Sequence, residues 1–223
     1  KFEPILFASA KTLLIMPLSG AINMFQIKNP KIKVTKKLAK KEKSLIFVGN
    51  SEDRKKGLLY LLQALTYLPE DVTLTVVDGG APHRSFAPLL TEKYKIGHRV
   101  HFTGKIGSED LVRFYCRAEI AVVPSLYEGF GFPAAEAMAC ELPVVASTAG
   151  ALPEVVGNEG AGILVPPRNA PALAQAINDL LQDAGLRWRM GQAARRRVLS
   201  LFTWENAAQQ MVEVYKEAID AHR

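Results

Sequence analysis

Residues 121–157, which read AVVPSLYEGFGFPAAEAMACELPVVASTAGALPEVVG, constrain the fold more than any other stretch of the chain. The apolar run at 120–123 is short and rich in β-branched side chains, which is typical of a buried strand. A loop with two glycines follows, and then Pro133 and an alanine-rich segment that ends at Cys140. Proline suits the start of a helix because its missing N–H would be unpaired there. The stretch therefore predicts a strand, a glycine-bearing loop, a helix and a second strand at 143–146.

The predicted loop suits an anionic ligand. A helix N-terminus carries unpaired N–H groups and a partial positive charge, so phosphate groups bind there. Gly129 and Gly131 let a ligand approach the backbone closely because they carry no side chain. Glu128 precedes the loop and Glu136 lies in the expected first turn of the helix; on one continuous helix they would point about 80° apart, so the loop must aim both at one ligand. Carboxylates accept several hydrogen bonds from hydroxyls, which predicts a sugar–phosphate ligand.

Short apolar runs alternate with helical patterns along the rest of the chain. Runs at 45–48, 72–77, 100–103 and 162–165 predict further strands. Helical spacing predicts helices from Gly57 onward and at 85–96, 108–117, 171–182, 186–200 and 204–222, with Ser108 and Thr203 as N-caps. Six strands that alternate with helices predict an α/β fold with a doubly wound, parallel, Rossmann-like sheet, which binds ligands at the carboxyl ends of its strands.

A second charged loop, NSEDRKKG, joins the strand at 45–48 to the following helix. Lysine is a compact, mobile charge that suits a diphosphate, and arginine is a fixed fork that suits two oxygens. Lys56 and Arg54 are therefore candidates for phosphate contact. A solvated charged loop is the alternative interpretation for Arg54 and Lys55.

The net charge of +6 comes from one segment, Lys28–Lys43, which carries +7 while the rest of the chain carries −1. Such a run is typical of a solvated linker, with contact to an anionic membrane surface as the alternative, and it predicts no nucleic-acid partner. Arg195–Arg197 likewise predict a solvated basic face. Cys116 and Cys140 lack metal-site spacing and predict reduced thiols in a cytoplasmic protein, and the four histidines predict no metal site.

Glu128-x7-Glu136 inside EGFGFPAAEAMACELPVVAS, followed by GALPEVV, resembles the donor-site signature of glycosyltransferase family 4, whose members are retaining enzymes of the GT-B fold. The resemblance runs from about residue 45 to 215 and implies the C-terminal half of a GT-B fold. Residues 1–44 would then form the interdomain crossover and lysine-rich linker. Residues 45–223 would form the nucleotide-sugar donor-binding domain with its C-terminal helices. Because the chain does not begin with Met, we expect a fragment of a longer protein.

The resemblance also implies roles for single residues. Lys56 matches the lysine that contacts the donor diphosphate, and Glu128 matches the carboxylate at the transferred sugar; these two are the catalytic candidates. Glu136 matches the carboxylate that contacts the ribose. The remaining implied donor contacts are those of the nucleobase, to the backbone of Lys105 and Ile106, and those of the phosphates, to Gly129, Phe130, Gly131 and Phe132.

The sequence departs from the family at one position of the second charged loop. Where the family has arginine directly after the glycine of the first strand, this chain has Asn50, and Arg54 is the candidate replacement. The implied activity is transfer of a hexose from a UDP-, GDP- or ADP-linked sugar to an acceptor hydroxyl, without a metal ion. The acceptor, a carbohydrate or a lipid, would be bound by an absent N-terminal domain, so we expect no transfer by this chain alone.

Two other functions stay open on the same fold. A regulatory module that binds a nucleotide sugar without chemistry is one alternative, and the departure at Asn50 favours it. A phosphorylase-like or sugar-epimerising relative is the other, although the chain shows no acid–base residues for epimerisation. The nucleobase and the sugar cannot be chosen from the sequence, because backbone contacts leave little trace in side chains.

Overall fold

The computed structural model describes residues 43–78 and 86–222, and within them six strands form one parallel sheet. The strands are β1 (Ser44–Val48), β2 (Thr73–Val77), β3 (Val100–Phe102), β4 (Ile120–Val123), β5 (Val144–Ser147) and β6 (Gly162–Val165). Their order is β3-β2-β1-β4-β5-β6, and every neighbouring pair is parallel. Strands β1 to β3 are added toward one edge of the sheet and β4 to β6 toward the other, so the strand order reverses between β1 and β4. This is the switch point where doubly wound sheets bind ligands. The predicted α/β fold is confirmed.

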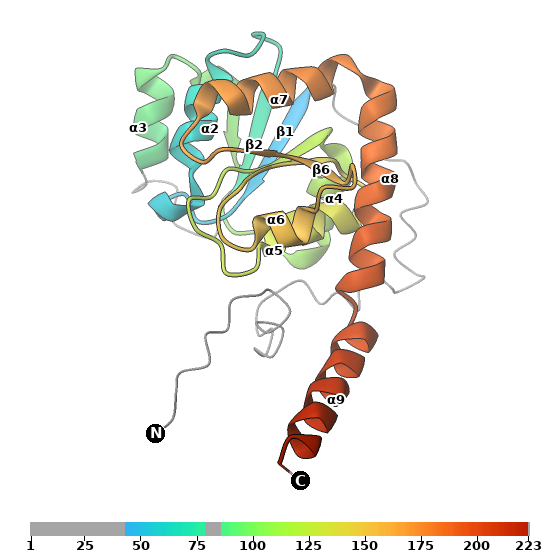
Figure 1. Cartoon of the computed structure of the whole chain (residues 1–223). Helices are drawn as coiled ribbons and strands as arrows, with labels where there is room; N and C mark the ends of the chain where they lie inside the picture. The colour runs from blue at the N-terminus through green and yellow to red at the C-terminus, as the bar shows by residue number, and fades with distance from the viewer. Residues whose placement is uncertain (1–42, 79–85, 223) are drawn as a thin grey trace.

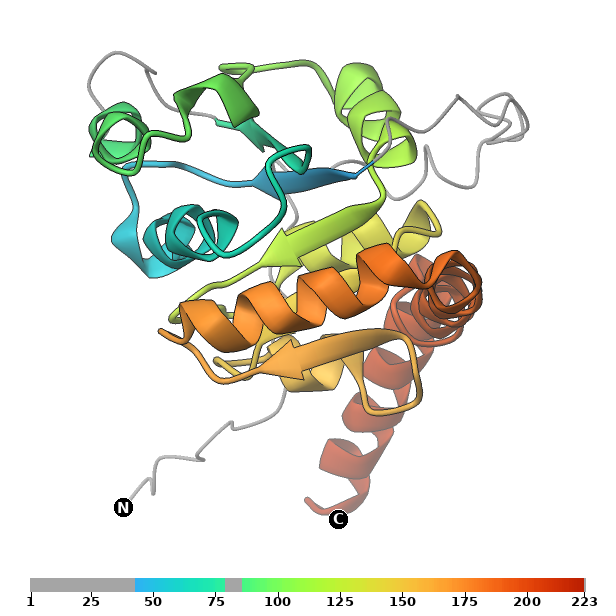
Figure 2. The same cartoon turned by 90° about the horizontal axis from the view of Figure 1, so that it is seen from above.

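Helices cover both faces of this sheet (Figures 1 and 2). One face packs against α2 (Leu58–Leu65), α3 (Phe86–Lys93) and α7 (Ala170–Gln182). The other packs against α4 (Ser108–Arg117), α5 (Phe132–Ala139), α6 (Leu152–Val156) and α8 (Ala184–Leu201). Successive strand residues point to opposite faces, so Leu45 and Phe47 join the first core while Ile46 joins the second. The continuous apolar strands of the sequence reflect this burial on both sides.

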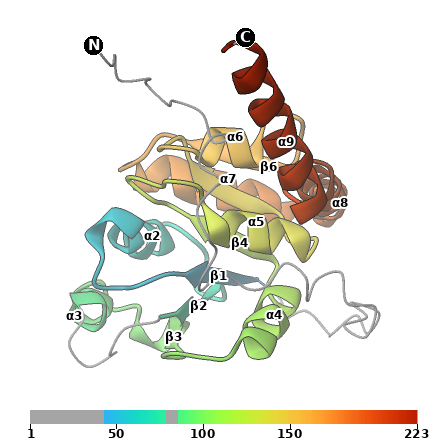
Figure 3. The ribbon, with the colours of Figure 1, turned by 90° about the horizontal axis from the view of Figure 1, so that it is seen from below.

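The last helix, α9 (Trp204–Asp220), extends away from the body of the molecule (Figures 1 and 3). Thr203 caps it, as predicted, by accepting a hydrogen bond from the Asn206 N–H at 3.3 Å. All residues of α9 are half-buried or exposed, including the large apolar Trp204, Tyr215 and Ile219. Within the described part of the chain, α9 thus presents an apolar surface that the rest of the fold does not cover.

Several predicted details differ in the structure. Ser108 is the first residue of α4 and Gly107 is its N-cap, so the predicted serine cap is wrong. Helix α3 ends at Lys93 rather than at the predicted residue 96, because Lys95 has a left-handed backbone conformation that turns the chain. Glu136 is the fifth residue of α5, beyond its first turn. The short helix α6 was not predicted. Residues 1–42, which hold the predicted crossover and all of the lysine-rich linker but Lys43, lie outside the described residues.

The prediction that Arg195–Arg197 form a solvated basic face is also wrong for Arg195 and Arg197. Arg197 donates from Nε to the Val155 carbonyl at 2.9 Å and from Nη2 to the Glu154 carbonyl at 2.7 Å. Arg195 donates from Nη1 to the Ala139 carbonyl at 2.5 Å. The last carbonyls of a helix have no partner within it, so these arginines cap the C-terminal ends of α6 and α5.

Replacing Arg197 by alanine is expected to lower the free energy of unfolding by about 2 kcal/mol, because it removes two hydrogen bonds from helix-end carbonyls. Chemical denaturation measures the change. Arg196→Ala is the matched control, since Arg196 is exposed and should change stability by no more than about 0.5 kcal/mol. Equal effects of the two substitutions would contradict the capping role.

Candidate functional site

Three loops meet at the carboxyl ends of β1, β4 and β5. The Leu126 N–H donates to the Lys55 carbonyl at 2.6 Å, which joins the loop after β1 to the loop after β4. The Ala151 N–H donates to the Glu128 carbonyl at 3.1 Å, which joins the loop after β4 to the start of α6. The backbone therefore holds the loop that carries Lys56 beside the loop that carries Glu128, at the switch point of the sheet.

At this junction the two catalytic candidates touch. Lys56 Nζ lies 2.8 Å from Glu128 Oε1, although the residues are 72 positions apart in the chain. The Glu128 side chain is 8% exposed and that of Lys56 is 28% exposed. A buried carboxylate needs a charged partner and further hydrogen bonds to remain ionised. The pair places a cation and a carboxylate together in a site that water reaches only in part.

Two buried serines, which the sequence reasoning missed, support this carboxylate. Ser125 Oγ donates to Glu128 Oε1 at 3.0 Å, and Ser147 Oγ donates to the Ser125 carbonyl. Both serines are 1% exposed. Their position at the carboxyl ends of two neighbouring buried strands was the available signal, because a polar residue there faces the ligand edge of the sheet.

The loop that carries Lys56 is held at both of its ends. The Ser51 N–H donates to Asp78 Oδ1 at 3.1 Å, and the Ser51 hydroxyl also bonds this carboxylate, which is fully buried at the end of β2. Asp53 caps the short 3-10 helix η2 (Arg54–Lys56) by accepting from the Lys55 N–H at 2.9 Å. Gly57 then turns the chain into α2 with φ of 73°. The position of Lys56 is therefore set by the fold as well as by its ion pair.

Arg54, the candidate replacement for the arginine that the family has at position 50, contacts a different part of the structure from Lys56. The Arg54 guanidinium stands 5.8 Å from the centre of the Phe86 ring, at the start of α3, in a cation–π contact. Asn50 is exposed, and its Oδ1 accepts a hydrogen bond from the Glu52 N–H at 2.9 Å, which stabilises a local turn. Neither contact reaches the Lys56–Glu128 pair.

The glycine loop lies close against the side chain of Leu152 in α6. Gly131 precedes α5 with φ of 97°, and a Cβ there would lie 2.7 Å from Leu152 of α6. Among the described residues no side chain caps the start of α5, where Pro133 has no N–H and the Ala134 N–H donates to the Gly131 carbonyl at 2.9 Å. Phe130 packs its ring against Phe132 at 4.8 Å and against Phe202 at 5.4 Å between ring centres. This packing of Phe130 holds the loop that follows Glu128 in place.

Glu136 is held by a residue that the sequence reasoning did not single out. The Tyr115 hydroxyl, from α4, donates to Glu136 Oε2 at 3.0 Å. Burial, and after it the negative charge of Glu136, raises the pKa of Tyr115 well above its usual value. Lys105 and Ile106 lie between β3 and α4, and Ile106 packs partly against the core that includes Tyr115. Glu136, predicted to contact the ribose, and residues 105–106, predicted to contact the nucleobase, therefore both lie next to α4.

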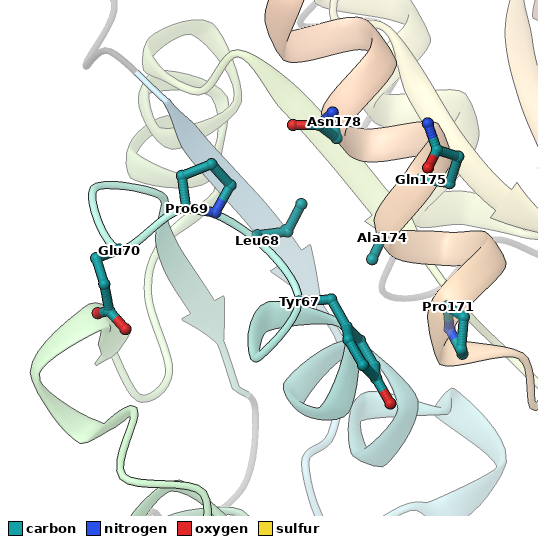
Figure 4. Close-up of a pocket in the computed structure, with 8 residues that line it drawn as sticks. All are labelled: Tyr67, Leu68, Pro69, Glu70, Pro171, Ala174, Gln175 and Asn178. Carbon is teal, nitrogen blue, oxygen red and sulfur yellow. The ribbon is translucent and has the colours of Figure 1, made fainter.

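A separate groove of about 620 Å³ lies between α7 and the turn before β2 (Figure 4). Tyr67 and Pro69 lie on one side of it, and Gln175 and Asn178 lie on the other (Figure 4). Because the turn precedes β2, this groove is at the amino ends of the strands. It contains none of the predicted site residues.

The described residues also bear on metal and membrane partners. From 43 to 78 and 86 to 222, no group of three or more His, Cys, Asp or Glu side chains could hold a metal ion. Over the same ranges, no helix has the length and apolar character needed to cross a bilayer. Cys116 is half-buried and Cys140 is buried, and neither forms a disulfide within the described residues.

The comparisons with known proteins agree with this geometry. Residues 28–197 match the family model described as "Glycosyl transferases group 1". The chain is 35% identical over 214 residues to MMP alpha-(1->4)-mannosyltransferase of Mycolicibacterium hassiacum, covering 95% of this chain and 50% of that protein. The chain spans about half the length of the curated relatives it matches.

Solved structures show the same fold. Sucrose-phosphate synthase from Thermosynechococcus elongatus aligns with a TM-score of 0.73 and 36% identity, over 96% of this chain and 52% of that one. The C-terminal domain of a glycosyl transferase group 1 family protein (LpcC) from Francisella tularensis aligns with a TM-score of 0.65 and 26% identity, over 86% of this chain and 98% of that one. The structural neighbours are GT-B glycosyltransferases. Its sequence match and its fold together show that this chain belongs to the glycosyl transferases group 1 family.

Proposed function

We propose that this chain is the donor-binding domain of a retaining glycosyltransferase of family 4, which transfers a hexose from a nucleotide-diphosphate sugar to an acceptor hydroxyl. The observation that carries the proposal is the 2.8 Å contact between Lys56 and Glu128 at the switch point of the sheet. The family match and the names of the relatives, which include a mannosyltransferase, support sugar transfer.

Lys56 and the start of α5 would stabilise the leaving group. Negative charge develops on the diphosphate as the bond to the sugar breaks, and fixed donors aimed at that charge lower the barrier. An ammonium has three donors, so Lys56 Nζ can keep its bond to Glu128 while it donates to a phosphate oxygen. The backbone N–H groups of 129–132 would bind the same phosphates at the helix N-terminus.

The two carboxylates would bind hydroxyls of the donor. Glu128, held by Lys56 and Ser125, would accept hydrogen bonds from hydroxyls of the transferred hexose. Glu136 would accept from the ribose, and the backbone of 105–106 would hold the nucleobase. Because phosphate charge is met here by Lys56 and backbone N–H groups, we expect donor binding to be insensitive to a metal chelator.

We place the chain in the C-terminal half of a two-domain enzyme. The near-complete coverage of a solved C-terminal domain from the same family supports this placement. The acceptor would be bound by the other half, and the apolar stripe of α9 would dock there through Trp204, Met211, Tyr215 and Ile219. A cytoplasmic location and peripheral membrane contact through Lys28–Lys43 remain predictions from the sequence.

Replacing Glu136 by alanine is expected to weaken binding of the preferred nucleoside diphosphate about tenfold, because one charged hydrogen-bond acceptor is lost from the ribose. Titration calorimetry with UDP, GDP and ADP measures the change. Glu109→Ala is the control, since Glu109 is an exposed acidic residue in the first turn of α4. Equal affinity of the wild type and Glu136→Ala would count against the assigned role.

A regulatory module that binds a nucleotide sugar without chemistry is the second candidate function. The local turn made by Asn50 and the cation–π contact of Arg54 favour it, because neither residue reaches the Lys56–Glu128 pair. Asn50→Arg in the full-length protein separates the two functions. An enzyme already active with Asn50 supports transfer, whereas activity that appears only with arginine supports the regulatory module.

A further inference from the structure

Tyr115 makes a buried contact with the carboxylate assigned to the ribose. Its side chain is 1% exposed, yet its hydroxyl donates to Glu136 Oε2 at 3.0 Å and lies 3.4 Å from the Pro133 carbonyl. A hydrogen bond to an ionised acceptor is shorter and stronger than one between neutral groups. The contact with the carboxylate is the shorter of the two, and through it Tyr115 joins α4 to the half-buried Glu136 of α5.

This contact restricts the orientation of the Glu136 carboxylate before a ligand binds. A glutamate side chain has three rotatable bonds, and fixing them on binding costs conformational entropy. With Oε2 held from within the protein, the carboxylate is already oriented before a ligand arrives, which lowers that cost. Tyr115 itself is rigid, because its ring packs in the core with Val112, Met138 and Cys140.

We infer that Tyr115 is a positioning residue of the donor site, whose hydroxyl orients the Glu136 carboxylate toward the two ribose hydroxyls of a nucleoside diphosphate. The inference rests on the proposed function and deepens it by assigning the ribose contact to a pair of residues. Tyr115 touches no part of the donor. Its effect therefore depends on the presence of Glu136 and of the ribose hydroxyls.

The test uses Tyr115→Phe, which keeps the buried ring and removes the hydroxyl. Affinities for UDP, GDP and ADP, and for the 2′,3′-dideoxy form of the tightest binder, are measured by titration calorimetry. Tyr115→Phe is expected to weaken binding of the ribose nucleotide on the order of tenfold, the size of one hydrogen bond, and to leave the dideoxy affinity unchanged. In a Glu136→Ala background the same substitution should have no further effect, because the two residues act as a unit.

Tyr94→Phe is the matched control. The Tyr94 hydroxyl accepts a hydrogen bond from Gln63 Nε2 at 3.1 Å, and Tyr94 packs on the opposite face of the sheet. Its removal should leave both affinities unchanged. A second variant, Glu136→Asp, keeps the charge but shortens the reach, so it should also lose affinity for the ribose nucleotide alone.

The outcomes separate the inference from the proposed function. Equal losses for the ribose and dideoxy nucleotides, or full affinity of Tyr115→Phe, would overturn the positioning role while wild-type binding still supports a donor site. Full affinity of Glu136→Asp would overturn the ribose contact of Glu136 and the positioning role with it. If Tyr115→Phe does not fold, Tyr115→Leu, which also lacks the hydroxyl, takes its place in the same titrations. A folded wild type that binds none of the three nucleotides would overturn both.

Discussion

Replacing Lys56 by methionine in the full-length protein is expected to lower kcat for sugar transfer by roughly 10²- to 10³-fold, the loss seen when one fixed donor to a developing charge is removed. Methionine keeps an unbranched apolar side chain but carries no donor. The leaving diphosphate then gains its charge without the ammonium that lies 2.8 Å from Glu128. The effect should fall mainly on kcat, because the interaction strengthens as the bond breaks.

Lys55→Met is the matched control for this prediction. Lys55 is the exposed neighbour of Lys56 in η2, and its hydrogen bonds to Asp53 and Leu126 are made by its backbone. This substitution should leave kcat within a factor of two or so, as surface changes usually do. Melting temperatures of both variants must be measured beside the rates, because Lys56→Met also leaves a buried carboxylate without its cation. A folded Lys56→Met enzyme with wild-type kcat would contradict the assigned role.

Replacing Gly57 by alanine is expected to destabilise the fold by about 3 kcal/mol or more, through overpacking and a strained backbone together. Gly57 has φ of 73°, and a Cβ there would lie 1.9 Å from the Pro124 carbonyl oxygen. The loop after β1 and the loop after β4 would have to separate, and with them Lys56 and Glu128. The variant should therefore lose both thermal stability and affinity for the nucleoside diphosphate.

Gly104→Ala isolates the backbone part of this effect. Gly104 also has positive φ, of 68°, but a Cβ there meets no atom within 4 Å. It should cost only about 1 kcal/mol, from the left-handed conformation alone. Chemical denaturation of the two variants gives the comparison, and a Gly57→Ala protein as stable as Gly104→Ala would show that the two loops are not packed as described.

The sheet could be predicted from the sequence because its strands are buried on both faces. Each strand is a short, continuous run of apolar residues, and strand β4 and strand β6 have the predicted bounds. The helix α6 was missed because it has only five residues and carries Pro153, so neither length nor period marks it. Arg197 was misread for a different reason, since its partners are backbone carbonyls 42 and 43 positions away.

The sequence predicted several residues of the site, but not the contacts between them. Resemblance indicated Lys56, Glu128 and Glu136, yet spacing along a chain cannot show that Lys56 and Glu128 touch. Ser125 and Tyr115 escaped notice because a buried serine or tyrosine looks like an ordinary core residue in sequence. Only the packing of α4 against α5 brings the Tyr115 hydroxyl to Glu136, which is 21 positions away.

A thermal-shift experiment measures whether this chain forms a nucleotide-sugar donor site. The chain is heated with UDP, GDP, ADP or their hexose conjugates, with and without a chelator. One nucleotide is expected to bind, with or without chelator, and to stabilise the fold by about 2.7 kcal/mol at 100 times its Kd. A folded chain whose melting temperature responds to none of these ligands would show that it forms no nucleotide-sugar donor site.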